Sequence, residues 1–383
     1  MQVTASTPTV HHKNMILPSH IRVLHIISGD LWAGAEAQAL TLITTIEDCD
    51  ITVALMNHGE LETRLIKAGI NTIVINERSL SSLKITHQLI QLIKRLKPDI
   101  IHTHRQKENI LGSFANFIAH KGISRQAKSV RTTHGAPEYK TTGLKKIINW
   151  LDNFCGKHLQ DAVISVSSNL KEQLKHTFPE NLIHIIPNGA DLDELQKTTP
   201  APDIRANMDD YYHVGIVGRL EPVKRIDLFI HAAQQIVQRQ PTLKIIFHIV
   251  GDGKLKQELI TLTQELGMSS HIQFHGHRSD STRVIASLDV IVMCSDHEGT
   301  PMTALETLAL GKPLVAHAVG GLREILSEYP QLLVNNHSAD GYSSKIIELI
   351  NNPIIPSLNN DYSSSSNATS TRNLYQQLLK SVE

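Results

Sequence analysis

The sequence predicts an α/β protein in which parallel sheets are covered by helices on both faces. Short apolar runs, typical of buried strands, alternate with amphipathic stretches typical of helices along most of the chain. The length of 383 residues favours two domains, and the 41% of hydrophobic residues is ample for two cores. A polar segment at 191–211, with two prolines, reads as the linker between them.

In the first half, residues 20–190, the apolar runs predict seven strands. They lie at Ile21–Ser28, Ile51–Met56, Ile70–Ile75, Asp99–Thr103, Lys128–Thr132, Ala162–Val166 and Ile183–Pro187. Helical periodicity fills the gaps between them, for example at Leu83–Leu96 and Glu108–His120.

Ligands bind parallel sheets at the carboxyl ends of the strands, so residues that follow strands are the first candidates for a site. Gly34 follows the first strand, on a loop that can bring backbone amides close to an anion. His104 and His134 follow two later strands. Each has an ordinary alternative, a tight turn that needs glycine or a hydrogen-bonded loop histidine, and the spacing alone leaves both interpretations open.

The second half, residues 212–352, repeats the pattern, with strands at His213–Val217, Ile245–Val250, Ile272–His275, Leu288–Met293 and Leu314–Ala316. Arg219 and Lys224 lie on the loop after the first of these strands. A guanidinium fork and an ammonium group so placed can converge on one diphosphate. The alternative to a diphosphate site is an ordinary basic turn at the surface, and charge alone does not exclude it.

The stretch Ser295–Glu324 is the most informative part of the chain. Thr300 suits an N-cap and Pro301 the first position of a helix, so we expect a helix to start there. The free amides of a helix start attract anions, and Glu298 and Glu306 flank this one with carboxylates. Amides for phosphate and carboxylates for hydroxyl groups suit a ligand with both phosphate and sugar parts.

The Glu298–Glu306 pair and its flanks, Glu-Gly-Thr-Pro and Val-Gly-Gly-Leu-Arg-Glu, resemble the E-x7-E region of retaining glycosyltransferases of family four. Ala33-Gly34-Ala35-Glu36, Thr132–Gly135, Pro187–Asp191 and Gly218–Lys224 are similar to further motifs of that family. The resemblance spans roughly residues 21–350. It implies two facing Rossmann-like domains (the GT-B fold), with the C-terminal helix crossing back to the first domain. The domain at 20–190 would shape the acceptor side, through Gly34 and His134, and the domain at 212–352 would bind the nucleotide sugar.

The resemblance also implies roles for individual residues. Arg219, Lys224, Glu298 and His134 would be catalytic, with the two cations stabilising the departing nucleotide diphosphate and His134 meeting the donor sugar. Glu306 would hold the ribose hydroxyls. The donor-binding set would comprise Gly34, Gly218, Arg219, Lys224, Gly251, His277, Glu298, Gly299, Thr300, Pro301, Met302, Thr303 and Glu306. The acceptor, a saccharide or a lipid-linked saccharide, would attack from the leaving-group face.

The stretch from Lys140 to Leu159 forms a basic amphipathic helix with Trp150 at its edge. Its apolar face comprises Leu144, Ile147, Ile148, Leu151, Phe154, Cys155, His158 and Leu159. We prefer a helix packed on the sheet. The alternative, peripheral contact with an anionic membrane, remains open because many relatives act on lipid-linked acceptors.

Composition also limits the partners and the cellular location that we expect for the protein. A net charge of zero excludes a general basic field for nucleic acid. The three cysteines have neither disulfide nor metal spacing, so we expect a cytoplasmic location, with the inner face of the cell membrane as the alternative. The resemblance implies no metal, and we expect no cofactor. Residues 1–19 read as a loose polar tail, 353–371 as a mobile polar segment and 372–383 as a terminal helix.

Two rival functions remain for this architecture. A non-hydrolysing sugar-nucleotide epimerase would turn over the donor without an acceptor. A non-catalytic sugar-nucleotide binding protein would bind the donor and never transfer its sugar, but it would not need Arg219, Lys224, Glu298 and Glu306 together.

Overall fold

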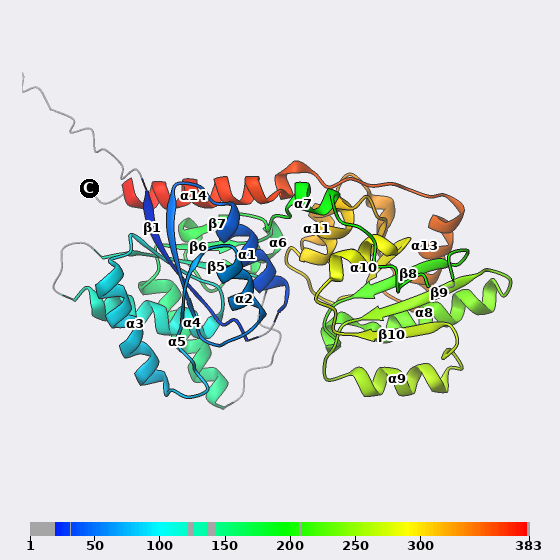
Figure 1. Ribbon diagram of the computed structural model, residues 1–383, viewed down its shortest axis with the longest axis horizontal. Coiled ribbons are helices and arrows are strands. Elements are labelled where there is room, and N and C mark those ends of the chain that lie inside the picture. The colour runs from blue at the N-terminus through cyan, green and yellow to red at the C-terminus, as the bar shows by residue number, and fades with distance from the viewer. Residues whose placement is uncertain (1–19, 31, 122–125, 136–142, 207, 381–383) are drawn as a thin grey trace, which may run out of the picture.

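The computed structural model comprises two α/β domains that lie side by side (Figure 1). It describes residues 20–30, 32–121, 126–135, 143–206 and 208–380, with 144 and 145 described by their backbone only. The predicted tail, residues 1–19, lies outside the described residues.

The described part of the N-terminal domain contains a seven-stranded sheet whose neighbouring strands are all parallel. In spatial order the strands are β3 (Asn71–Val74), β2 (Cys49–Leu55), β1 (Ile21–Ile27), β4 (Ile100–Thr103), β5 (Lys128–Thr133), β6 (Ala162–Ser165) and β7 (Ile183–Ile185). The helices are α1 (Gly34–Thr45), α2 (Glu60–Lys67), α3 (Ser82–Leu96), α4 (Gln106–Ala119), α5 (Leu144–His158) and α6 (Ser168–Leu174).

The C-terminal domain contains a six-stranded parallel sheet within the described ranges. Its order is β10 (Ile272–Gly276), β9 (Ile245–Val250), β8 (Tyr212–Val217), β11 (Val290–Met293), β12 (Leu314–His317) and β13 (Leu333–Val334). The helices are α7 (Leu192–Gln196), α8 (Ile226–Arg239), α9 (Lys256–Glu265), α10 (Ser281–Ser287), α11 (Met302–Ala309), α12 (Leu322–Ile325) and α13 (Ala339–Asn351). The predicted fold class, two parallel-sheet α/β domains, is confirmed.

Each sheet has a point where the strand order reverses, between β1 and β4 in the first domain and between β8 and β11 in the second. The loops that leave neighbouring strands at such a point run to opposite faces of the sheet and open a crevice between them. The two reversal points are therefore where the fold itself favours ligand binding.

The C-terminal segment departs from the prediction. The last helix, α14 (Ser364–Lys380), begins at Ser364 rather than at Arg372, and Figure 1 shows it lying along the N-terminal domain. In the segment before this helix, Tyr329 and Glu328 hydrogen-bond to Ser357 and Asn359. The predicted crossing back to the first domain is confirmed, and residues 364–371, predicted to be part of a mobile polar segment, are helical.

The predicted linker at 191–211 also differs. It contains α7, and Leu195, Ala201 and Ile204 are buried in the core of the C-terminal domain. The segment is polar on average, but these three apolar side chains are spaced so that they reach that core. It therefore belongs to the second domain.

The α5 helix is turned differently from our preferred interpretation. Its inward side carries Asp152, which pairs with the buried Arg131, and Gly156, which lies against the ring of Phe178. These two contacts determine the rotation of the helix. Part of the predicted apolar face is therefore exposed, including Ile147, at 56% of its surface, whereas Cys155 of the same face is buried.

Candidate functional site

The C-terminal domain contributes a charged pair at its reversal point. β8 leads into the loop that carries Lys224, and β11 leads into the segment that carries Ser295 and Glu298. Lys224 Nζ donates to Glu298 Oε1 at 2.6 Å, and the Ser295 hydroxyl donates to the same oxygen at 2.6 Å. A small recess beside the pair is lined by Gly218, Lys224 and Ser295. Among the described residues, these hydrogen bonds engage only one carboxylate oxygen of Glu298, and the second can serve another partner.

Glycine allows the ends of β8 and β9 to approach each other beside this pair. Gly251 has a φ of +140°, and a Cβ atom there would clash with the Gly218 carbonyl. Arg219 and His277 are exposed on the loops after β8 and β10, at the same edge of the sheet. In the described chain, the structure packs neither of them on the Lys224–Glu298 pair.

The start of α11 is capped differently from the prediction. Pro301, not Thr300, occupies the N-cap position, and the helix begins at Met302. The buried Thr300 hydroxyl donates to the Val166 carbonyl of the N-terminal domain, and Asn188 Nδ2 donates to the Thr300 carbonyl at 2.7 Å. Thr300 fails to cap the helix because its hydroxyl joins the two domains.

Two further predicted residues follow on α11. Thr303 lies in its first turn, and its carbonyl accepts a hydrogen bond from the Thr307 hydroxyl. Glu306 lies one turn later, where burial raises the pKa of its carboxyl to about 7. A buried carboxyl group that is partly protonated in this way can form hydrogen bonds with the hydroxyl groups of a ligand.

The N-terminal domain meets this region through Gly34 and His134. A Cβ atom at Gly34 would lie 3.9 Å from Met302 Cγ, so the start of α1 faces the start of α11. A Cβ atom at Gly299 would clash with the His134 carbonyl. The structure thus brings Gly34, His134, Gly299 and Met302 together at the junction of the domains.

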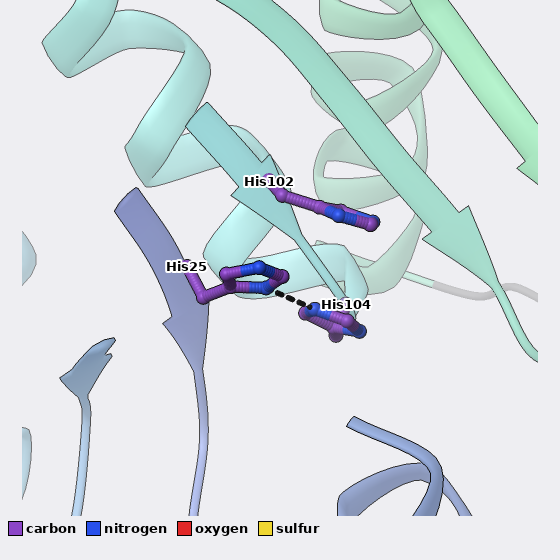
Figure 2. Close-up of side chains that lie close together, drawn as sticks. All are labelled: His25, His102 and His104. Atoms are coloured by element: carbon purple, nitrogen blue, oxygen red, sulfur yellow. Dashed lines mark hydrogen bonds between the residues drawn. The ribbon is translucent and has the colours of Figure 1, made fainter. Parts of the chain in front are cut away.

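Behind His134 lies a stack of three buried histidines, shown in Figure 2. His25 and His104 share a hydrogen bond of 3.0 Å, and the His104 ring stacks on His102 with centroids 4.5 Å apart. Burial lowers the pKa of His25 to about 3 and lowers the pKa of His102 and His104 as well, so all three are neutral.

The ring nitrogens of the three histidines lie within 4.8 Å of one another, which raises the question of a metal. Both His102 nitrogens are already hydrogen-bonded, to Tyr375 at 2.6 Å and to Thr132 at 2.7 Å. Stacked rings also direct their in-plane lone pairs along separate layers rather than to one point. As placed, the three side chains therefore fit a hydrogen-bonded stack better than a metal centre.

Comparisons with known proteins agree with this arrangement of two domains around a shared junction. Residues 32–194 match the family model described as Glycosyltransferase Family 4, and residues 200–368 match the one described as Glycosyl transferases group 1. The chain belongs to the family-four glycosyltransferases. The two models meet where the two domains meet, so the assignment covers both halves of the site.

Relatives and solved structures resemble the glycosyltransferase over most of its length. An α-1,3-galactosyltransferase of Escherichia coli is 25% identical, over 88% of this chain and 90% of its own. The crystal structure of Anabaena HepE with UDP-glucose has a TM-score of 0.75 and 22% identity, covering 95% and 98% of the two chains. Sucrose-phosphate synthase of Thermosynechococcus elongatus has a TM-score of 0.70 and 18% identity, covering 94% and 99%. The solved structures therefore share the fold of the glycosyltransferase.

Sequence reasoning missed several charged residues of the first domain. Arg105 directly follows His104 at the end of β4, and Glu108 lies in the first turn of α4. Arg105 binds the carboxylates of Asp30 and Glu36. The rule that singled out His104, position after a strand, would also have indicated Arg105. The burial of Glu108 depends on packing and has no comparable signal in the sequence.

No described helix of the glycosyltransferase has both the length and the apolar character needed to cross a bilayer.

Proposed function

We propose that the glycosyltransferase transfers a hexose from UDP-hexose to the sugar of a diphosphate-linked lipid, as a step of bacterial surface-polysaccharide synthesis. The observation that carries the proposal is the Lys224–Glu298 pair, which lies at the reversal point of the C-terminal sheet beside the start of α11. The E. coli relative acts on UDP-Gal and GlcNAc-diphosphoundecaprenol, and the Anabaena structures contain UDP or UDP-glucose. Both support a UDP-sugar.

In the proposed reaction the sugar keeps its anomeric configuration. The bond between C1 of the sugar and the β-phosphate oxygen breaks, and the acceptor hydroxyl oxygen bonds to C1 on the same face. The hydroxyl proton passes to the departing phosphate oxygen, so no protein nucleophile is needed. Lys224 and Arg219 neutralise the charge that develops on the diphosphate, and Glu298 holds hydroxyl groups of the sugar with its free oxygen. Glu306 binds the ribose.

Nucleotide binding is tested first, by thermal shift with UDP, GDP, ADP and CMP, since a ligand of the folded state raises its melting temperature. We expect UDP to give the largest rise. Lys224→Met should abolish most of that rise and lower kcat by about 10²–10³-fold, the usual cost of one such cation. Lys244→Met is the matched control, because Lys244 pairs with Asp210 on the surface, with 60% of its side chain exposed.

Product analysis then separates the proposal from its rivals. NMR of the product formed from UDP-galactose and a GlcNAc diphosphate lipid should show an α linkage. A C2 epimer of the donor formed without acceptor would indicate an epimerase. UDP binding with no turnover on any acceptor would indicate a binding protein.

We also propose that the glycosyltransferase contacts the inner face of the cell membrane through an apolar surface formed by α5 and α4. The exposed side chains of this surface are Ile147, Ile148, Trp150 and Phe154 from α5, and Phe117 and Ile118 from α4. Trp150 and Phe114 both stack on Phe154, which makes the surface continuous between the two helices. Exposed lysines 146 and 157 flank it and suit anionic headgroups.

Co-sedimentation with phosphatidylglycerol vesicles tests the membrane contact. The double variant Ile147→Ser and Trp150→Ser should lower binding by about 10-fold or more, since it removes two large apolar side chains from the surface. Ile355→Ser is the control, because Ile355 is 84% exposed but belongs to the other domain. Equal binding of all three proteins would remove the membrane proposal and leave the transferase proposal intact.

A further inference from the structure

The N-terminal domain has its own charged group of residues at the point where its strand order reverses. Asp30 follows β1, Glu36 lies in the first turn of α1, and Arg105 follows β4. Arg105 Nη1 donates to Asp30 Oδ1 at 3.2 Å, and its Nη2 donates to Glu36. With Glu108 from the start of α4, these residues form what we call the β1/β4 cluster.

Several buried polar atoms in and beside the β1/β4 cluster have no hydrogen-bond partner among the described residues. They are one carboxylate oxygen of Glu36, one of Glu108, and Nδ1 of His104. The residues are 0%, 3% and 3% exposed. Buried polar atoms are nearly always paired in folded proteins, so a group of unpaired ones on a single sheet edge indicates a place for a polar ligand.

The charges of the cluster indicate what kind of ligand it takes. Both terminal nitrogens of the Arg105 guanidinium group already bind carboxylates. The cluster contains three acidic side chains, Asp30, Glu36 and Glu108, and only this one cation. Burial raises the pKa of Glu36, and it raises the pKa of Glu108 to about 7. A phosphate group would face carboxylates here, whereas a hydroxyl group can both donate to a carboxylate oxygen and accept from a protonated one.

The cluster also lies beside the donor site. Burial, together with the smaller effect of the nearby Arg105 charge, lowers the pKa of His134 to about 4. The backbone of His134 packs on Gly299, and α1, which carries Glu36, begins at Gly34 against Met302. A sugar bound at the cluster would therefore lie next to the start of α11, where the donor is expected.

We propose that the β1/β4 cluster, formed by Asp30, Glu36, Arg105 and Glu108, binds the hydroxyl groups of the acceptor sugar and not the diphosphate that links it to lipid. This inference rests on the proposed function and deepens it. Arg105 acts as a positioning residue, because it holds the carboxylates of Asp30 and Glu36 in place. Glu36 and Glu108 contact the acceptor with their unpaired oxygens.

The test compares two acceptors with UDP-galactose as the donor: octyl GlcNAc diphosphate, and the octyl glycoside of GlcNAc, which has no phosphate. Glu36→Gln and Glu108→Gln should raise KM for both acceptors by about 10-fold or more, and by the same factor, since each loses a hydrogen bond from a charged or shared-proton oxygen. UDP binding should change by less than about 2-fold in either variant, which also shows that the variants are folded.

Glu172→Gln is the matched control, because its side chain is 67% exposed on α6, away from the cluster. Arg105→Lys keeps the positive charge but loses the two guanidinium nitrogens that hold Asp30 and Glu36. The KM for both acceptors should therefore rise while UDP binding stays the same. Saturation-transfer NMR on the octyl glycoside with UDP present gives a readout that needs no turnover, and we expect its signal to fall in both glutamine variants.

Three results would overturn the inference. They are an unchanged KM in both glutamine variants, a rise confined to the diphosphate acceptor, and no saturation transfer from the wild-type protein to the octyl glycoside. None of these would affect UDP binding or its loss in Lys224→Met, so the inference and the proposed function can fail separately.

Discussion

Glu306 is the single residue whose electrostatics lead most directly to a measurement. Burial raises the pKa of its carboxyl from 4.5 to about 7 in the folded chain. Below about pH 4.5 the group is protonated in both the folded and the unfolded states, so it does not affect stability there. As the pH rises from about 4.5 towards 7, Glu306 ionises in the unfolded chain while it stays largely protonated in the folded chain. The unfolded state is therefore stabilised relative to the folded state. Glu306 therefore lowers the stability of the ligand-free protein progressively over that range.

We predict that Glu306→Gln removes this pH dependence. The melting temperature of the variant, relative to wild type, should rise by about 2–4 °C more at pH 8 than at pH 4.5, as expected for roughly 1 kcal/mol. Differential scanning fluorimetry without ligand measures the difference. Glu265→Gln on the exposed end of α9 is the control, and its difference should not vary with pH. A constant difference for Glu306→Gln would contradict the prediction.

At this scale the sequence indicated where functional residues stand but not how they pair. Lys224 and Glu298 were predicted from their positions after strands and from their family motifs, yet their direct contact appears only in the folded chain. Thr300 shows the opposite case. The local sequence of Thr300 favours an N-cap, but its hydroxyl donates a hydrogen bond to a backbone carbonyl of the other domain instead.

Among the elements, α14 shows most clearly how tertiary contacts override local preference. Its first two turns are rich in serine and threonine, which are weak helix formers. They become helical because Asn367 bonds to Gln38 and to the Pro187 carbonyl, and Ala368 and Thr371 are buried. These partners lie far away in the sequence, so no local pattern could have indicated the true start of the helix.

We predict that the anchor between α14 and the first domain is energetically significant. Tyr375→Phe would leave the buried His102 nitrogen without its 2.6 Å partner and should lower the free energy of unfolding by about 1–3 kcal/mol. Denaturant titration measures the loss. Tyr329→Phe removes two 3.2 Å bonds to the hydroxyl and backbone amide of Ser357 at the surface, where water can replace them, and should cost less than about 0.5 kcal/mol. Equal losses in the two variants would show that the His102 bond is not an anchor.

The orientation of α5 is also determined by tertiary packing. Its sequence shows one apolar face, which for an isolated helix would be the inward face. The ion pair of Asp152 with Arg131 and the close approach of Gly156 to Phe178 instead rotate the helix, so that only one edge of the apolar face, with the buried Cys155, points inward. An apolar pattern shows that a helix has a face, but the partners of that face are decided by the rest of the fold.

At the scale of the whole molecule, the two domains touch through a few specific contacts near the site. Thr300 binds the Val166 carbonyl, and Glu324 accepts hydrogen bonds from the backbone and hydroxyl of Ser168. Gly299 packs on the His134 carbonyl without room for a side chain. Closure of the domains over a donor would exclude water and limit its hydrolysis.

We predict that Gly299→Ala prevents this close approach and lowers the transfer rate by about 100-fold, the cost of a misplacement on the order of 1 Å. Small-angle scattering with UDP should show a larger radius of gyration than wild type. Gly135→Ala is the matched control, because a Cβ atom there meets nothing within 4 Å. An unchanged radius and rate for Gly299→Ala would show that the domains need not meet at this point.

The sequence by itself determined the alternation of strands and helices, the division into two domains and the residues that follow each strand. These depend on periodicity and on short motifs, which are properties of neighbouring residues. The tertiary structure alone decided how the last helix is anchored, which side of α5 faces outward, and that Arg105 gathers Asp30 and Glu36. Each of these depends on contacts between residues far apart in the chain, where packing and burial outweigh local preference.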